Sequence, residues 1–201
     1  MASRKIGNRR NDTSLHLEQL TFGLKNKLNE LPRVSNVTSD DNGPCTVADL
    51  RAWEYKNFVF MPDDMKRFYM STDGMHTSWT YNYSKRAKLR VGHLYIPKLT
   101  HIQNLELKGP GTVFELDRIG DRGFVLLVYK TNVTTRPEIY LLEVGSWKWT
   151  LLADSFTTYL RMTIEHLGLP CWQLAFASCR LPGWAEQLFL VLAPHLLLDN
   201  D

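Results

Sequence analysis

The spacing of the apolar residues changes abruptly at Gly74, and this change limits the folds that the chain can adopt. Before Gly74, apolar residues recur every three or four positions, as they do along one face of a helix. After Gly74 they alternate with polar residues, as they do along one face of a strand. A chain with helices first and strands afterwards favours an α+β fold over repeated strand-helix units.

Two helices and a loop are predicted upstream of the change. The first helix spans residues 13–31, where leucines recur at helical spacing until Pro32 ends it. Residues 35–44 are polar and end in a glycine-proline pair, so they are predicted to form a loop. The second helix starts at Thr46, which can form a capping box with Asp49. Its predicted inner face consists of Val47, Leu50 and Trp53.

A third helix ends at the change of spacing. Pro62 suits a first helical turn, because its missing N–H needs no partner there. Gly74 is the expected left-handed residue that stops the helix. The residues predicted to form the apolar stripe are Met65, Phe68 and Tyr69.

Strands are predicted from residue 78 onward. The first places three aromatic residues on one face, namely Trp79, Tyr81 and Tyr83. The second has a basic face with Arg86, Lys88 and Arg90, and an apolar face with Ala87, Leu89 and Val91. Further strands are predicted at 112–117, 123–130, 138–144 and 147–152. The connections between these last strands are too short for crossover helices, so the sheet from about residue 112 onward is predicted to be antiparallel.

A last helix signal follows these strands. Asp154 or Ser155 can cap the helix, and Gly168 followed by Pro170 ends it. Its predicted buried residues are Phe156, Tyr159, Leu160, Ile164 and Leu167. The predicted fold is therefore a single α+β domain with N-terminal helices, an antiparallel sheet and a C-terminal helix packed on that sheet.

The sequence and its composition argue against a secreted protein, a membrane-spanning protein and a dedicated nucleic-acid-binding protein. No apolar run approaches the roughly 18 residues of a membrane span, and the N-terminal residues lack the apolar core of a secretory signal. The formal net charge of +3 is small for a dedicated nucleic-acid binder. The cysteines are odd in number and lack C-x-x-C spacing, which indicates reduced thiols rather than disulfides or zinc ligands. We therefore expect a soluble intracellular protein.

No motif for catalysis or cofactor binding is found. The chain lacks a P-loop, a G-x-G-x-x-G after a strand and a G-x-S-x-G nucleophile turn. No two histidines stand four residues apart on one predicted helix, so a helical metal site is not indicated. The sequence therefore predicts no cofactor, no metal and no enzymatic activity of its own.

One cluster of basic residues suits binding. Lys85, Arg86, Lys88 and Arg90 fall within six residues on a predicted strand. Such a row can hold an acidic peptide by charge-assisted contacts. Basic residues are also common on strand faces that only keep a protein soluble, and that interpretation is the more frequent one. Both interpretations remain open at this point.

Three segments resemble a known superfamily. The helix MPDDMKRFY, the following STDGMHTSW and the closing LADSFTTYLRMTIEHLG resemble the SUKH superfamily, which includes fungal cell-wall-synthesis regulators and bacterial immunity proteins. Longer segments, such as LRAWEYKNFVFMPDDMKRFYMSTDGMHTSWTY and VGHLYIPKLTHIQNL, are similar to a family of tubulin polyglutamylase complex subunits. The resemblance covers roughly residues 15–178.

The resemblance implies a fold and a role. The implied core includes Phe68, Tyr69, Gly74, Trp79, Phe156, Tyr159 and Leu160. The implied role is that of a non-catalytic scaffold or adaptor in a complex that adds glutamate chains to tubulin tails, with catalysis on a separate tubulin-tyrosine-ligase-like subunit. Implied partners are the other subunits and, indirectly, tubulin or microtubules, without membrane or nucleic acid. The implied location is the cytoplasm and the cytoskeleton, including microtubules, the centrosomal region, centriolar satellites and the cilium.

The resemblance also suggests three regions. Residues 1–12 are predicted to be a basic flexible arm, residues 13–178 the SUKH-like domain, and residues 179–201 an atypical C-terminal segment. Family members are expected to continue into a longer basic tail, which makes this segment an alternative or truncated end. Its apolar stripe is predicted to lack cover, giving a poorly packed end or a partner-dependent helix. The stripe consists of Trp184, Leu188, Phe189 and Leu192.

Two other functions remain open from the sequence alone. One is an enzyme with a nucleotide-dependent ligase site assembled from acids far apart in the chain. The other is an RNA-binding module that uses the tyrosine face and the basic strand.

Overall fold

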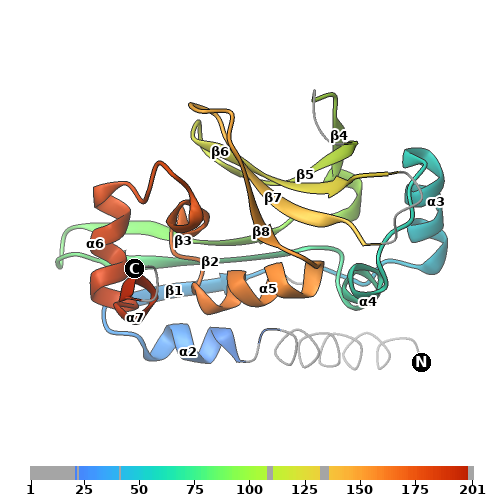
Figure 1. Ribbon diagram of the computed structural model, residues 1–201. Helices are drawn as coiled ribbons and strands as arrows, with labels where there is room; N and C mark the ends of the chain where they lie inside the picture. The colour runs from blue at the N-terminus through green and yellow to red at the C-terminus, as the bar shows by residue number, and fades with distance from the viewer. Residues whose placement is uncertain (1–20, 22, 41, 108–110, 132–135, 199–201) are drawn as a thin grey trace, which may run out of the picture.

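Two antiparallel sheets and several helices make up the α+β domain shown in Figure 1. The computed structural model describes residues 21–198, except for 22, 41, 108–110 and 132–135. The predicted α+β class is therefore confirmed. The predicted N-terminal arm, residues 1–12, lies outside the described residues.

The smaller sheet has the strand order β1-β2-β3 and the larger one the order β4-β5-β6-β7-β8. The smaller sheet contains β1 (Val34–Ser39), β2 (Met75–Asn82) and β3 (Lys88–Ile96). The larger sheet contains β4 (Gln103–Leu105), β5 (Thr112–Ile119), β6 (Gly123–Tyr129), β7 (Glu138–Glu143) and β8 (Trp149–Ala153). Every pairing is antiparallel, as predicted for the later strands. The chain leaves β3 through Pro97 and a short 3₁₀ turn, which separates the two sheets.

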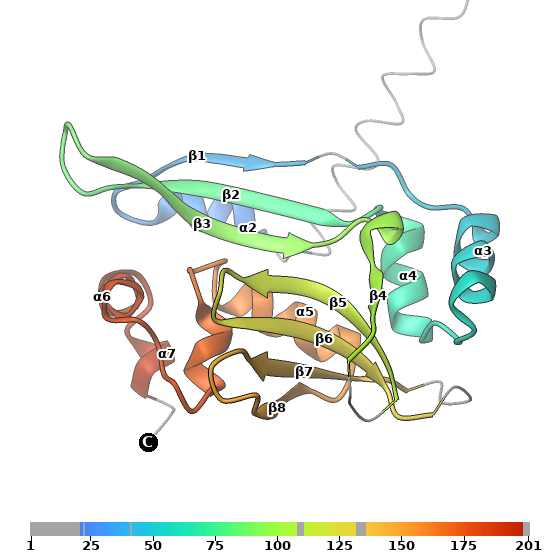
Figure 2. The same ribbon diagram turned by 90° about the horizontal axis from the view of Figure 1, so that it is seen from above.

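Helices α2 and α5 lie along one side of the sheets, as Figures 1 and 2 show. The helices are α2 (Leu24–Glu30), α3 (Val47–Asn57), α4 (Asp63–Ser71), α5 (Phe156–Glu165), α6 (Gly183–Leu192) and α7 (His195–Leu198). The predicted starts of α3 and α5 are confirmed. The Thr46 hydroxyl accepts from the Asp49 N–H, and the Asp49 carboxylate accepts from the Thr46 N–H at 2.8 Å. The Ser155 hydroxyl accepts from the N–H of Thr158.

Two predictions near the N-terminus are corrected. Helix α2 begins only at Leu24, because Gly23 adopts a left-handed conformation with φ of 70° and interrupts the predicted helix. Residues 13–20 of that prediction lie outside the described residues. The loop predicted at 35–44 is wrong in its first half, which forms strand β1. Hydroxyl side chains hold this strand to β2, since Thr38 contacts Ser78 at 2.9 Å.

The core lies between the sheets and the helices, and Trp79 is at its centre. Its side chain is 1% exposed, and its indole N–H donates to the carbonyl of Leu167 at 2.9 Å. Gly92 is the cross-strand neighbour of Trp79, and a Cβ there would lie 2.1 Å from the indole nitrogen. The indole therefore crosses strand β3 at Gly92, where the absence of a side chain leaves room for it. The other large aromatic and aliphatic residues expected inside are also buried, namely Phe68, Tyr69, Phe156, Tyr159 and Leu160.

Gly74 has the left-handed conformation expected of it, but it does not end the helix. Helix α4 already ends at Ser71, and Thr72 caps it in an extended conformation. Gly74, with φ of 79°, stands at the start of β2. A Cβ there would lie 2.8 Å from backbone atoms of residues 96–98, so its smallness allows the close approach of two chain segments.

Several predicted inner positions are not fully covered, including Leu167, which follows the end of α5 and is only partly buried. Val47 on α3 is 53% exposed, and Leu89 on β3 is 57% exposed. On α5, Ile164 is only partly buried, and Thr163 occupies the buried position instead. Thr163 satisfies its hydroxyl by donating to the carbonyl of Tyr159 at 2.8 Å, which removes the cost of burying it.

The C-terminal segment packs against the domain, contrary to the prediction of a poorly packed end. The side chains of Leu188, Phe189 and Leu192 are buried and belong to the main core, whereas Trp184 is 53% exposed. Three of the four residues of the predicted stripe are therefore buried. A buried carboxylate helps to hold this segment, because Glu143 accepts from both the N–H and the hydroxyl of Ser178.

Replacing Glu143 with alanine should loosen the C-terminal segment. Burial opposes ionisation of Glu143, but hydrogen bonds from Ser178 and Ser146 prevail and lower its pKa. Losing these charged hydrogen bonds should cost about 2 kcal/mol in the free energy of unfolding. Ser146→Ala, which removes one of the bonds, should cost less than about 1 kcal/mol. Hydrogen exchange across 183–192 should accelerate in the Glu143 variant, and unchanged exchange there would contradict this role.

Candidate binding surface on the β2–β3 hairpin

The hairpin that joins β2 to β3 extends beyond the body of the domain, as Figure 2 shows. All side chains of residues 83–90 are exposed. This stretch contains no acidic residue. It contains the basic residues predicted to form a binding face, namely Lys85, Arg86, Lys88 and Arg90.

The turn of the hairpin divides the predicted row of basic residues. Strand β2 ends at Asn82, whose partner Lys88 is the first residue of β3. The Ser84 hydroxyl accepts from the N–H groups of Arg86 and Ala87, which closes the turn. Lys85 and Arg86 therefore lie at the tip, and only Lys88 and Arg90 stand on the strand. The prediction that Arg86 shares their strand face is wrong, because the paired strands stop before it.

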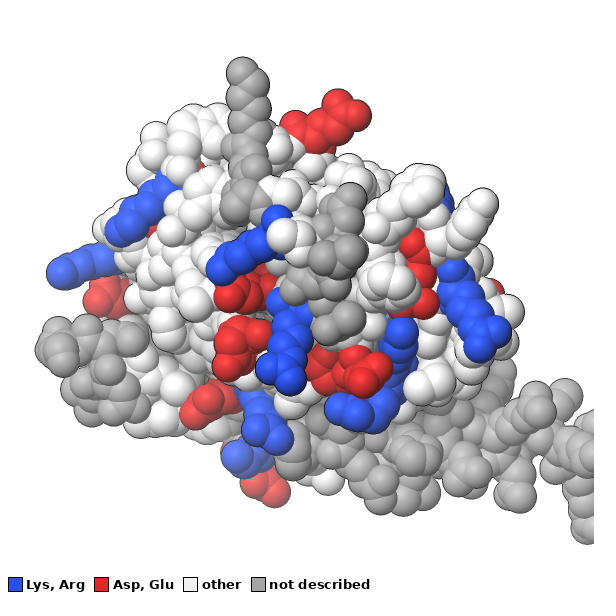
Figure 3. Space-filling model, turned by 45° about the vertical axis from the view of Figure 1, so that its right-hand side comes forward, with Lys and Arg blue, Asp and Glu red and all other residues white. Residues whose placement is uncertain are grey.

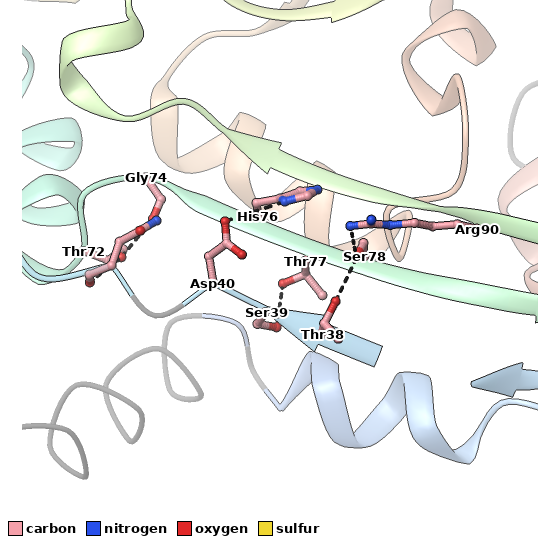
Figure 4. Close-up of polar contacts among 10 residues, drawn as sticks. Thr38, Ser39, Asp40, Thr72, Gly74, His76, Thr77, Ser78 and Arg90 are labelled. Atoms are coloured by element: carbon pink, nitrogen blue, oxygen red, sulfur yellow. Dashed lines mark hydrogen bonds and ion pairs between the residues drawn. The ribbon is translucent and has the colours of Figure 1, made fainter. Parts of the chain in front are cut away.

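Arg90 is held at the base of the hairpin by hydroxyl groups of the neighbouring strands. Its guanidinium donates to the Ser78 hydroxyl at 2.6 Å, and that hydroxyl contacts Thr38 (Figure 4). Sequence reasoning missed Ser78 and Thr38. For Thr38 the signal is the serine- and threonine-rich stretch 35–39, which looks like a loop until its partner strand is known, and Ser78 lies outside that stretch.

Two histidines continue this surface toward the other end of β3. The rings of His76 and His93 lie 5.2 Å apart, and His76 faces Asp40 at 3.7 Å (Figure 4). Burial, together with the nearby His76 and Arg90, lowers the pKa of His93. A lowered pKa favours the neutral form of His93. The lysines and arginines give the surface positive charge that does not depend on these histidines.

The basic residues of the hairpin have no ion-pair partner within the described part of the chain. The ion pairs found there are Lys66–Glu54, His76–Asp40, Arg118–Glu115 and Lys130–Glu138. Figure 3 brings the α3 end of the molecule forward, and there basic and acidic side chains are interspersed. The hairpin differs from that face because four cations follow one another without an acid between them. Such a surface is suited to an acidic ligand.

The described residues offer no metal site and no activated thiol. No group of three or more histidine, cysteine or acidic side chains among them could hold a metal ion. Burial raises the pKa of Cys45 to about 12, and it also raises the pKa values of Cys171 and Cys179. All three thiols are therefore protonated at neutral pH, and a protonated thiol is a poor nucleophile.

Among the residues described, no helix is both long and apolar enough to cross a membrane.

A partly buried carboxyl group lies in a cavity of about 280 Å³ beside the β5–β6 turn. Gln173 donates to the Asp117 carboxylate at 3.2 Å, and the N–H of Arg118 donates to it at 2.8 Å. Burial outweighs these hydrogen bonds and raises the pKa of Asp117 to about 7.

Asp117→Asn should stabilise the protein more at pH 8 than at pH 5. In the unfolded chain the carboxyl ionises near pH 4, but in the folded chain it ionises only near pH 7. Between these values the folded state holds a proton that the unfolded state has lost, so rising pH favours unfolding. Asparagine removes this dependence. The thermal midpoints of both proteins at both pH values measure it, and an equal difference at pH 5 and pH 8 would contradict the burial.

No family model matches the chain. Among curated proteins, tubulin polyglutamylase complex subunit 2 of Rattus norvegicus is 32% identical over 214 residues, which cover 89% of this chain and 72% of the relative. The Homo sapiens protein of the same name is 32% identical, with 89% and 71% covered, and the Mus musculus protein is 31% identical, with 89% and 72% covered. The chain belongs to the tubulin polyglutamylase complex subunit 2 family. The longer segments LRAWEYKNFVFMPDDMKRFYMSTDGMHTSWTY and VGHLYIPKLTHIQNL resembled this family, so the family inferred from them is confirmed.

Proposed function

We propose that this chain is a non-catalytic scaffold subunit of a tubulin polyglutamylase complex, and that its β2–β3 hairpin receives an acidic segment of a partner or a tubulin tail. The observation that carries the proposal is the hairpin itself, a projecting surface with four cations and no acid between them. Its relatives are named as subunits of a complex, which supports the scaffold role. In this proposal the ligase chemistry lies on a separate tubulin-tyrosine-ligase-like subunit.

The chemistry of the hairpin fits an extended acidic chain. Lys88 and Arg90 stand two residues apart on one strand, which separates them by roughly 6.6 Å. Alternate residues of an extended peptide repeat at the same distance, so alternate carboxylates can meet successive cations. Each contact would be a charge-assisted hydrogen bond, which is stronger than a neutral one. A chain of glutamates has the required charge, and the relatives are named as subunits of a polyglutamylase complex.

The proposed location follows from the proposed partners. A scaffold of this complex would work in the cytoplasm, associated with microtubules and the centrosomal region. The described residues include no helix that could span a membrane.

Two measurements test the proposed function. The full chain, tagged and expressed in cells, should co-purify with the ligase-like subunit of the polyglutamylase complex. The purified chain alone, given ATP, glutamate and tubulin, should incorporate no glutamate. Failure to co-purify would overturn the subunit role, and glutamate incorporation by the isolated chain would overturn the non-catalytic role.

A further inference from the structure

The outer face of α3 carries an apolar stripe that no described residue covers. Val47 is 53% exposed, Tyr55 is 83% exposed and Phe58 is 76% exposed. Val47, Arg51 and Tyr55 follow at intervals of four residues, which places them on one side of the helix. The ring of Phe58, the residue that caps the helix, lies 6.4 Å from the Tyr55 ring. A different side of the helix packs inward through Leu50 and Trp53, both buried. Helix α3 therefore has a second apolar side in addition to the one that the fold uses.

Phe58 is an unfavourable choice for the isolated chain. It caps the C-terminus of α3 in the left-handed conformation, with φ of 55°. Glycine is the usual residue there, because a Cβ makes this conformation costly. The Phe58 ring gains little in return, since its ring neighbour is Tyr55 at 6.4 Å and most of its surface is exposed. Contacts with a partner outside the described chain would offset this cost.

The charge on this face indicates the chemistry of what covers it. Arg51, in the middle of the stripe, is exposed and has no ion-pair partner among the described residues. The acids nearby are engaged, because Asp49 caps the helix at Thr46 and Glu54 pairs with Lys66 at 2.8 Å. The face is thus apolar and aromatic with one free positive charge. Arginine and tyrosine are among the residues most enriched in the centres of protein interfaces.

We propose that this face of α3 docks a helix of another protein, which has apolar side chains at helical spacing and a carboxylate placed to meet Arg51. The stripe runs over about 16 Å of helix, and the side-chain ridges of one helix fit the grooves of another. A second copy of this chain fits less well, because a symmetric contact would bring the two Arg51 side chains together. The face lies at the opposite end of the molecule from the hairpin (Figures 1 and 2). Both surfaces can therefore be occupied at once, and this proposal does not depend on the ligand of the hairpin.

Photo-crosslinking identifies what covers the face. The full chain is expressed in cells with p-benzoylphenylalanine in place of Tyr55, and the crosslinked peptides are sequenced. The matched control carries the same group in place of Leu190, which is 58% exposed on α6. Position 55 should crosslink to one protein, through a segment with acidic and apolar residues at helical spacing. Crosslinks only to the chain itself, no crosslinks at all, or the same set of proteins as position 190 would overturn the proposal.

A pair of variants separates docking from folding. Phe58→Gly relieves the left-handed backbone, so its thermal midpoint should stay the same or rise, while recovery of the crosslinked protein should fall at least about tenfold. Arg51→Glu should reduce recovery similarly, and Leu190→Ala should not. Unchanged recovery in the first two variants, or a lowered midpoint in Phe58→Gly, would overturn the proposal. The hairpin is unaltered in all three variants. Its binding of acidic ligands can therefore be measured separately and tests the proposed function independently of this proposal.

Discussion

Trp79→Ala is expected to lower the free energy of unfolding by about 3 to 5 kcal/mol. The indole is buried, passes over Gly92 of the neighbouring strand and donates to the Leu167 carbonyl, which lies beyond the end of α5. Its removal leaves a cavity and also leaves that carbonyl without its partner. For a chain of this size the thermal midpoint should fall by roughly 6 to 20 °C. Trp147→Ala is the control, since Trp147 is 65% exposed and its loss should cost less than about 0.5 kcal/mol.

A double-mutant cycle tests the cause of this effect. Gly92→Ala alone should destabilise the protein by about 1 to 3 kcal/mol, because the new methyl group overlaps the indole. In the Trp79→Ala background the same change should cost less than about 0.5 kcal/mol, since the overlapping group is gone. Equal costs in the two backgrounds would contradict the packing of Trp79 over Gly92.

Reversing Lys88 and Arg90 to glutamate should weaken binding of a synthetic oligoglutamate peptide by more than about tenfold at low salt. The difference should shrink at about 1 M salt, where the Debye length falls to about 3 Å. Lys88 is exposed and its reversal should change stability by less than about 0.5 kcal/mol, while Arg90 also loses its bond to Ser78, worth about 1 kcal/mol. Binding is measured by fluorescence anisotropy with the full chain, and folding by the thermal midpoint.

The matched control for this experiment reverses Arg67 and Arg161, which are exposed on α4 and α5. It changes the net charge by the same amount at a different place. Weaker binding in the hairpin variant alone supports a recognition surface. Equal binding in the hairpin variant and the unaltered chain leaves only the interpretation of a strand that keeps the protein soluble.

The elements with local signals were predictable from the sequence. The capping box at Thr46, the proline before α4 and the serine before α5 are read directly from neighbouring residues, and all three helices begin there. Strands β5 to β8 were predictable because each is a short run rich in apolar residues, and short turns join these runs. Such signals need no knowledge of the rest of the fold.

The elements that depend on distant partners were not predictable. Residues 34–39 become a strand because β2, about 40 residues later, supplies hydroxyl and backbone partners. One side of helix α6 is buried against the core, and the sequence of the helix does not reveal which part of the fold covers it. The candidate site divides in the same way. The basic residues of the hairpin are visible in the sequence, whereas their exposure and the anchoring of Arg90 by Ser78 depend on where the strands lie.

The most direct test of the scaffold role is glutamate incorporation into tubulin by the polyglutamylase complex isolated from cells that lack this chain. Incorporation should be low in that complex, should be restored when the purified full chain is added back, and should be absent with the chain alone. Full activity and assembly of the complex without the chain would contradict the scaffold role, as would incorporation by the chain in isolation.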